Sequence, residues 1–289
     1  MIELLAPVLL AAVGFAYARR AKTLAERGQP VPWWRQLCFG LGLLILLVTD
    51  VPPLSELAEE LIVAHMAQHL LIGDLAALGI ALGLTGPLLQ PLLRLPGLGW
   101  LRHLGNPLIA LPLWILNLYL WHLGALYQGV LDSPALHFAQ HFGFLTFGVI
   151  MWMPVVGPLP TPSWFGNAAK LVYVVAVRFS GAVLANVMIW SGSPLYPDYE
   201  PTEQEHGISA LADQGAAGGV MMLEGGAVTL ALFAWLFFRW ARQDTERQEL
   251  LDLADRHGVP LDPKRAGRAA AAGRADELAA RIRRQPAGR

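Results

Sequence analysis

Charged residues are scarce in this chain of 289 residues. Only 15% of the residues are Asp, Glu, Lys or Arg, against about 25% in an ordinary soluble domain. Hydrophobic residues make up 55% of the chain. Their side chains have more apolar surface than the core of one water-soluble domain can bury. Lys and Arg are rarest before residue 239: nine of the 21 lie there, and 12 follow Phe238. This distribution is typical of a multi-spanning membrane protein with a polar tail.

Other absences exclude classes of function. Cys38 is the only cysteine, which excludes an internal disulfide framework and a cysteine-based zinc site. A formal net charge of −1, with the only basic cluster in the tail, argues against nucleic acid as a partner. The sequence also has no glycine-rich phosphate-binding motif.

Seven segments are apolar enough to cross a bilayer, where each crossing needs about 20 helical residues. They cover residues 2–18, 36–50, 57–84, 107–127, 137–157, 169–190 and 215–238. The sequence therefore predicts an all-α, polytopic membrane protein, a bundle of seven transmembrane helices. The first segment contains Glu3 and is followed by Arg19 and Arg20, so we interpret it as an uncleaved span rather than a signal peptide.

The basic residues set the orientation, because Lys and Arg are retained on the cytoplasmic side. Twenty of the 21 fall in the tail or in connections on one side, and Arg178 lies inside the sixth span. We therefore expect the N-terminus outside and the C-terminus in the cytoplasm. Residues 1–240 form the expected seven-span transmembrane domain, and residues 241–289 a cytoplasmic, charged tail that is helical or disordered or binds anionic lipid headgroups.

Five of the eight histidines gather near the expected outer face. His65 and His69 lie in the third span, His122 near the outer end of the fourth, and His137 and His141 at the start of the fifth. Residues four apart share a helix face, so each HxxxH pair can present two imidazoles to one ion. Polar side chains inside a membrane are costly and usually functional. We therefore favour a metal or cofactor site over an interhelical hydrogen-bond network or a proton relay.

Imidazole binds copper, zinc and iron, and thioether sulfur favours Cu(I). Met66 and Met221 are possible thioether ligands, although ordinary apolar packing is the favoured explanation for these methionines. Asp213 shares a helix face with Met221 on the seventh span.

Three charges are expected at mid-depth, namely Asp74, Arg178 and Glu224. On an ideal helix Asp74 points about 140° away from His69, which places it off the histidine face. An unpaired charge in the membrane costs several kcal/mol. We therefore predict that Asp74 or Glu224 pairs with Arg178.

Around these histidines and in several further short motifs, the sequence resembles the CtaG family of bacterial cytochrome c oxidase assembly factors, the multi-spanning proteins associated with caa-type oxidases. The likeness runs through His65-Met66-Ala67-Gln68-His69-Leu70-Leu71, Trp121-His122 with Tyr127, His137 and His141 with Phe144 and Trp152-Met153-Pro154, then Asp213-Gln214, Gly218-Gly219 and Met221. It departs from the family pattern at Gly73-Asp74, Gly124 and Leu223.

The resemblance implies a non-enzymatic role in the maturation of a heme-copper oxidase in the bacterial inner membrane. It implies binding or delivery of copper, as Cu(I), at a site that faces the periplasm or outside. The implied metal ligands are His65, His69, His122, His137, His141 and Asp213. The implied partners are cytochrome c oxidase subunits and membrane lipids, and the sequence leaves a homodimer open.

Three other functions compete with this interpretation. A seven-span zinc hydrolase of lipid amides would use zinc to activate water, but no serine falls beside the histidines. A di-iron oxygenase related to desaturases would need adjacent histidine pairs at the cytoplasmic face, and the chain has none. A heme-binding subunit needs only two axial imidazoles, fewer than this cluster offers.

Overall fold

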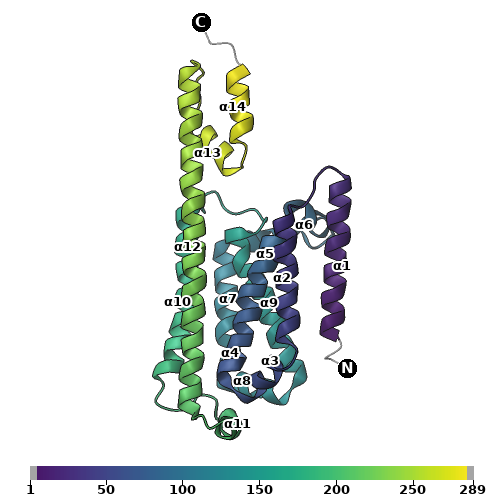
Figure 1. Cartoon of the computed structure of the whole chain (residues 1–289), viewed down its shortest axis with the longest axis vertical. Coiled ribbons are helices and arrows are strands. Elements are labelled where there is room, and N and C mark those ends of the chain that lie inside the picture. Colours follow the sequence, from purple (N-terminus) through teal and green to yellow (C-terminus); the bar gives the residue numbers. More distant parts are fainter. Residues whose placement is uncertain (1–4, 285–289) are drawn as a thin grey trace. The chain divides into compact units, whose positions relative to one another are not determined.

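The structure, a computed structural model, describes residues 5–284. Over that range the chain is built from helices and contains no strand (Figure 1). The helices are α1 (Leu5–Glu26), α2 (Trp33–Thr49), α3 (Leu54–Glu60), α4 (Ile62–Leu70), η1 (Leu71–Ala76), α5 (Ala77–Gly83), α6 (Gly86–Leu93), η2 (Gly99–Gly105), α7 (Pro107–Trp121), α8 (Gly124–Asp132), α9 (Pro134–Val156), α10 (Asn167–Trp190), η3 (Pro197–Tyr199), α11 (Glu200–Glu205), α12 (Ala210–Arg256), α13 (Pro263–Ala271) and α14 (Ala275–Arg284). The all-helical prediction is confirmed for the described residues.

The chain consists of two compact units, Met1–Ala227 and Val228–Arg289. The first unit contains every residue of the candidate site. The second contains α13, α14 and the end of α12, whose buried residues Leu250, Ala254, Ala266, Leu278 and Ile282 form a small core of their own. Asp262 caps α13 by accepting a hydrogen bond from the backbone N–H of Lys264.

Four of the described helical segments are long and apolar enough to cross a membrane: Ile62–Gly83, Pro134–Val156, Asn167–Trp190 and Ala210–Arg256. Two bent helix pairs raise the number to six if each pair is one span. They are Trp33–Thr49 with Leu54–Glu60, and Gly99–Gly105 with Pro107–Trp121. The expected first span begins among residues 1–4, which include Glu3 and lie outside the described residues.

The membrane interpretation also agrees with the outward surface of these helices. Leu108 on α7, Phe179 on α10 and Leu223 on α12 are all more than two-thirds exposed. Such large apolar side chains are unfavourable in water, but lipid tails solvate them at no cost.

Glycines allow the central helices to approach each other closely. A Cβ atom at Gly148 of α9 would lie 2.9 Å from Cβ of Ala77 and would overlap the backbone of Gly73 in η1. Small residues at helix contacts are the usual way in which membrane helices pack closely. Gly148 therefore fixes how near α9 lies to the segment that follows His69.

We expect Gly148→Ala to lower the free energy of unfolding by about 1–3 kcal/mol, because the methyl group would force α9 away from η1. The control is Gly181→Ala on α10, where a Cβ would meet nothing within 4 Å and alanine favours the helix. Thermal unfolding of both variants in detergent measures the difference. Equal midpoints would contradict the role assigned to Gly148.

Candidate functional site

Four imidazole rings gather between α4 and α9. Within each helix the rings are neighbours, with centroids 4.2 Å apart for His65 and His69 and 4.3 Å apart for His137 and His141. Across the two helices His65 faces His137 at 5.9 Å, and His69 faces His141 at 5.7 Å. The two HxxxH pairs of the sequence therefore form one group, which we call the four-histidine cluster.

His65 presents a lone pair to this cluster. Its Nδ1 lies 3.2 Å from the carbonyl oxygen of Ala58 and 3.1 Å from the hydroxyl of Tyr199. A carbonyl oxygen only accepts hydrogen bonds, so in the neutral ring Nδ1 carries the hydrogen and Nε2 the lone pair. That Nε2 is buried and has no hydrogen-bond partner among the described residues.

His69 is the least satisfied of the four rings. It is 4% exposed, and within the described part of the chain neither of its ring nitrogens has a hydrogen-bond partner. A buried donor or acceptor without a partner costs about 1–3 kcal/mol. Such a group in a native structure is typical of a site completed by a ligand or an ion.

His137 and His141 contact each other directly, with their Nε2 atoms 3.0 Å apart. Behind them, Asp50 Oδ1 lies 3.6 Å from Nδ1 of His141. A carboxylate on the far nitrogen of an imidazole orients the ring and raises its basicity in many metal sites. Asp50 and the Ala58 carbonyl thus support one histidine of each pair from outside the cluster.

Among residues 5–284, no group of three or more His, Cys, Asp or Glu side chains already has the arrangement of a metal site. The four rings pack against one another instead of converging their nitrogens on one point. Their donor set nevertheless suits a transition metal, because the buried lone pairs on His65 and His69 are unused.

His122 lies beside the four-histidine cluster. Its ring packs against Tyr127 and Phe144, with centroid distances of 6.1 and 6.3 Å. Its Nδ1 lies 2.7 Å from the carbonyl oxygen of Leu118, and its Nε2 lies 3.4 Å from Sδ of Met66. The structure therefore associates this histidine with a methionine.

Asp213 binds the beginning of α4. Its Oδ2 accepts a hydrogen bond of 2.6 Å from the backbone N–H of Ile62, and its Oδ1 accepts one of 3.2 Å from Val63. A carboxylate at the N-terminus of a helix accepts hydrogen bonds from free backbone N–H groups, and its negative charge interacts favourably with the helix dipole. Both oxygens of this expected metal ligand are thus engaged with the backbone just before His65.

Three tyrosines surround the histidines and were not predicted as functional residues. Tyr199 contacts His65, Tyr196 donates a hydrogen bond to the carbonyl oxygen of His122, and Tyr127 stacks on Tyr196 at 3.8 Å. All three are at most 2% exposed. Tyr196 and Tyr199 come from the connection between α10 and α12, where no sequence periodicity points to burial.

Glu203 of α11 titrates in an unusual range. Burial and, to a smaller extent, the nearby carboxylate of Asp213 raise the pKa of the Glu203 carboxyl to about 7. The folded protein therefore holds a proton on Glu203 up to about pH 7, whereas the unfolded chain releases it near pH 4.5. The protonated Glu203 thus contributes to the stability of the fold at low pH, and this contribution is lost as the pH rises toward 7.

We expect the thermal midpoint to fall as the pH is raised from about 5 to about 8. Glu203→Gln, which keeps a hydrogen-bond donor and cannot ionise, should flatten that dependence. Glu205→Gln on the same short helix, where the side chain is exposed, should leave it unchanged. Identical pH profiles for the wild type and Glu203→Gln would contradict the assignment.

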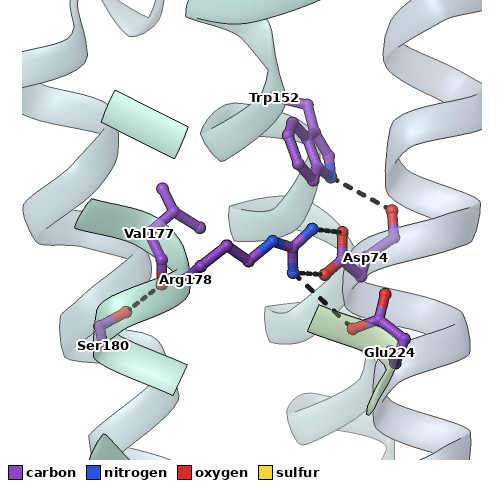
Figure 2. A network of polar contacts seen from close by, with 6 residues as sticks. All are labelled: Asp74, Trp152, Val177, Arg178, Ser180 and Glu224. Carbon is purple, nitrogen blue, oxygen red and sulfur yellow. Dashed lines mark hydrogen bonds and ion pairs between the residues drawn. The ribbon is translucent and has the colours of Figure 1, made fainter. Parts of the chain in front are cut away.

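A buried ion-pair network joins η1, α10 and α12 (Figure 2). The two terminal guanidinium nitrogens of Arg178 on α10, Nη1 and Nη2, donate to the carboxylate of Asp74 on η1. Nη1 also lies 3.7 Å from Oε2 of Glu224 on α12. The ring of Trp152 lies 5.3 Å from the guanidinium and its Nε1–H donates to the carbonyl oxygen of Asp74. The predicted pairing of Arg178 is confirmed with Asp74 as the principal partner.

The position of Asp74 differs from the prediction. Asp74 and His69 line the same small cavity, whereas an ideal α-helix would place them about 140° apart. The reason is that residues Leu71–Ala76 form a π-helical turn, η1, whose hydrogen bonds span one residue more than those of an α-helix. The wider turn brings Asp74 back toward the histidine face.

The structure thus combines several helices that are long and apolar enough to cross a membrane with a buried imidazole cluster and a buried ion-pair network. The chain belongs to the family described as cytochrome c oxidase caa3 assembly factor (Caa3_CtaG), whose family model matches residues 15–243.

Among curated proteins, the chain is similar to Uncharacterized protein Mb0105 of Mycobacterium bovis and Uncharacterized protein MT0111 of Mycobacterium tuberculosis. Each is 24% identical over 267 residues, which covers 85% of this chain. The chain spans only 39% of the length of either relative. No solved structure matches this chain.

Proposed function

We propose that this protein is a non-enzymatic assembly factor that binds copper through His65, His69, His137 and His141 and supplies it to a cytochrome c oxidase. The observation that carries the proposal is the four-histidine cluster, in which buried nitrogens of His65 and His69 lack hydrogen-bond partners among the described residues. Membership of the oxidase assembly family supplies the recipient.

Copper is the cargo in this proposal, so the site must both bind and release the metal. Neutral imidazoles bind copper well, and metal binding at His65 needs no proton loss because its Nε2 already bears the lone pair. The rings are packed but not converged, so the site closes only when the metal arrives. Both carboxylate oxygens of Asp213 accept hydrogen bonds from the backbone of α4. Asp213 therefore serves this site by holding α4, and with it His65, in position.

The proposed topology places the cluster at the periplasmic face of the bacterial inner membrane. It has seven spans, with the N-terminus outside and residues 241–289 in the cytoplasm as a domain separate from residues 1–240. Its support is the charge asymmetry, because 20 of the 21 Lys and Arg residues fall on one side or in the tail. An oxidase subunit embedded in the same membrane can then meet the cluster from outside.

Metal analysis of the purified protein tests the proposal. The wild type, in detergent, is exposed separately to Cu(I), Zn(II) and Fe(II), and bound metal is measured after dialysis together with an absorption spectrum. We expect retained copper in the wild type and less bound copper in His65→Ala/His69→Ala. The control is His103→Ala on η2, a histidine outside the cluster, which should retain copper.

Retention of zinc but not copper would overturn the copper assignment and favour a hydrolytic site. Absence of metal from the wild type would mean that the histidines only hold α4 and α9 together. In that case the double variant should have a lower thermal midpoint than the wild type but the same metal content.

A further inference from the structure

A small cavity borders the four-histidine cluster on the side of His122. Its volume is about 40 Å³, enough for one ion or one water molecule. Met66, His122 and Met221 line it, together with His69 and Asp74 and otherwise apolar residues. It brings together two thioethers and two imidazoles from α4, α12 and the residue after α7.

The tautomer of His122 shows what this cavity can bind. Because Nδ1 lies 2.7 Å from the carbonyl oxygen of Leu118, which can only accept, Nδ1 carries the hydrogen of the neutral ring. The lone pair is then on Nε2, which lies 3.4 Å from Sδ of Met66. Two lone-pair donors therefore face each other at the cavity wall with no hydrogen between them. A cation that both can bind resolves this contact.

The separation of the two atoms matches that of two ligands on one metal. With metal–nitrogen and metal–sulfur bonds of about 2.0 and 2.3 Å, ligands at a tetrahedral angle lie about 3.5 Å apart. A third donor is available on α12, where Met221 lines the cavity and packs against the buried cluster that contains Met66. Imidazole with thioether sulfur is a donor set that selects Cu(I) over zinc and iron.

A carboxylate and a further histidine also border the cavity. Asp74 lines it and is paired with the guanidinium of Arg178. His69 borders the cavity as well as the four-histidine cluster, and its nitrogens have no partner among the described residues. This histidine is therefore placed between two groups of metal donors.

We propose that Met66, His122 and Met221 form a second, Cu(I)-selective site, and that His69 stands between it and the four-histidine cluster. The proposal rests on the proposed function in one respect, that copper is the cargo. It goes further in giving the protein two copper positions of different ligand chemistry, one of imidazoles and one rich in sulfur.

The experiment is X-ray absorption at the copper edge, with copper counted per chain, on the full-length protein loaded anaerobically with Cu(I). We expect about two Cu(I) per chain with copper–sulfur scattering in the wild type. Met66→Leu/Met221→Leu, a volume-conserving change, should bind about one and lose the sulfur scattering. Met188→Leu is the matched control, because Met188 is buried in the same apolar cluster but does not line the cavity.

A second variant separates this proposal from the proposed function. His137→Ala/His141→Ala should lose one copper and keep the sulfur-rich one. Copper bound by the wild type with nitrogen ligands alone, or sulfur scattering that survives Met66→Leu/Met221→Leu, would overturn the second site and leave the proposed function standing. A wild type that binds no copper would overturn both.

Discussion

Replacing Arg178 with glutamine is expected to lower the free energy of unfolding by about 3–5 kcal/mol. Arg178 is the only cation that contacts Asp74 and Glu224 among the described residues, and Asp74 is 3% exposed. Removing the guanidinium leaves a buried carboxylate without its partner, and this uncompensated charge is the source of the loss. Thermal unfolding in detergent and the yield of membrane-inserted protein measure it.

Two further variants show whether charge or geometry matters. Arg178→Lys keeps the charge but cannot make two parallel hydrogen bonds to Asp74, so we expect an intermediate loss. Arg178→Gln combined with Asp74→Asn should recover part of the stability, because the uncompensated carboxylate is gone. If the double variant were as unstable as the sum of the two single variants, the buried ion pair would not be the cause.

The second large effect is expected in cells. In a strain whose wild-type gene is replaced by the His65→Ala/His69→Ala variant, the activity of the caa3-type oxidase should fall to the level found in a strain without the protein. Removal of two of four imidazoles lowers metal affinity by more than the roughly 10–100-fold that follows loss of an outer hydrogen bond. Oxidase activity and the copper content of the purified oxidase are the measurements.

Added copper distinguishes a weakened site from a lost one. Excess copper in the medium should restore oxidase activity in part in the His65→Ala/His69→Ala strain if the cluster supplies copper. His103→Ala should behave as the wild type. A double variant that is inserted at normal levels and fully supports the oxidase would exclude the cluster from the supply of copper.

The sequence predicted the parts of the site that depend on helical periodicity. The spacing of His65 and His69, and of His137 and His141, placed each pair on one helix face, and their common depth brought the pairs together. The pairing of Arg178 followed from the high cost of a lone charge in a membrane. Both arguments need only a straight helix and an approximate depth.

The remaining features depend on local departures from regular structure. The π-turn η1, which turns Asp74 toward the histidine face, has no signature in residue type that periodicity can detect. Asp213 accepts hydrogen bonds from residues about 150 positions earlier in the chain, and sequence spacing says nothing about such a contact. The burial of Tyr196 and Tyr199 depends on how an irregular connection folds, for the same reason.

The π-turn has a consequence for insertions and deletions. A π-turn contains one residue more than the α-helical turn that would replace it. Deleting a single residue within Leu71–Ala76 would therefore restore a continuous α-helix, and α5 would keep its orientation relative to His69 because the π-turn accommodates the extra residue locally. A one-residue gap at this point in an aligned relative would mark a protein whose histidines and α5 keep their places while the local bulge at Asp74 is gone.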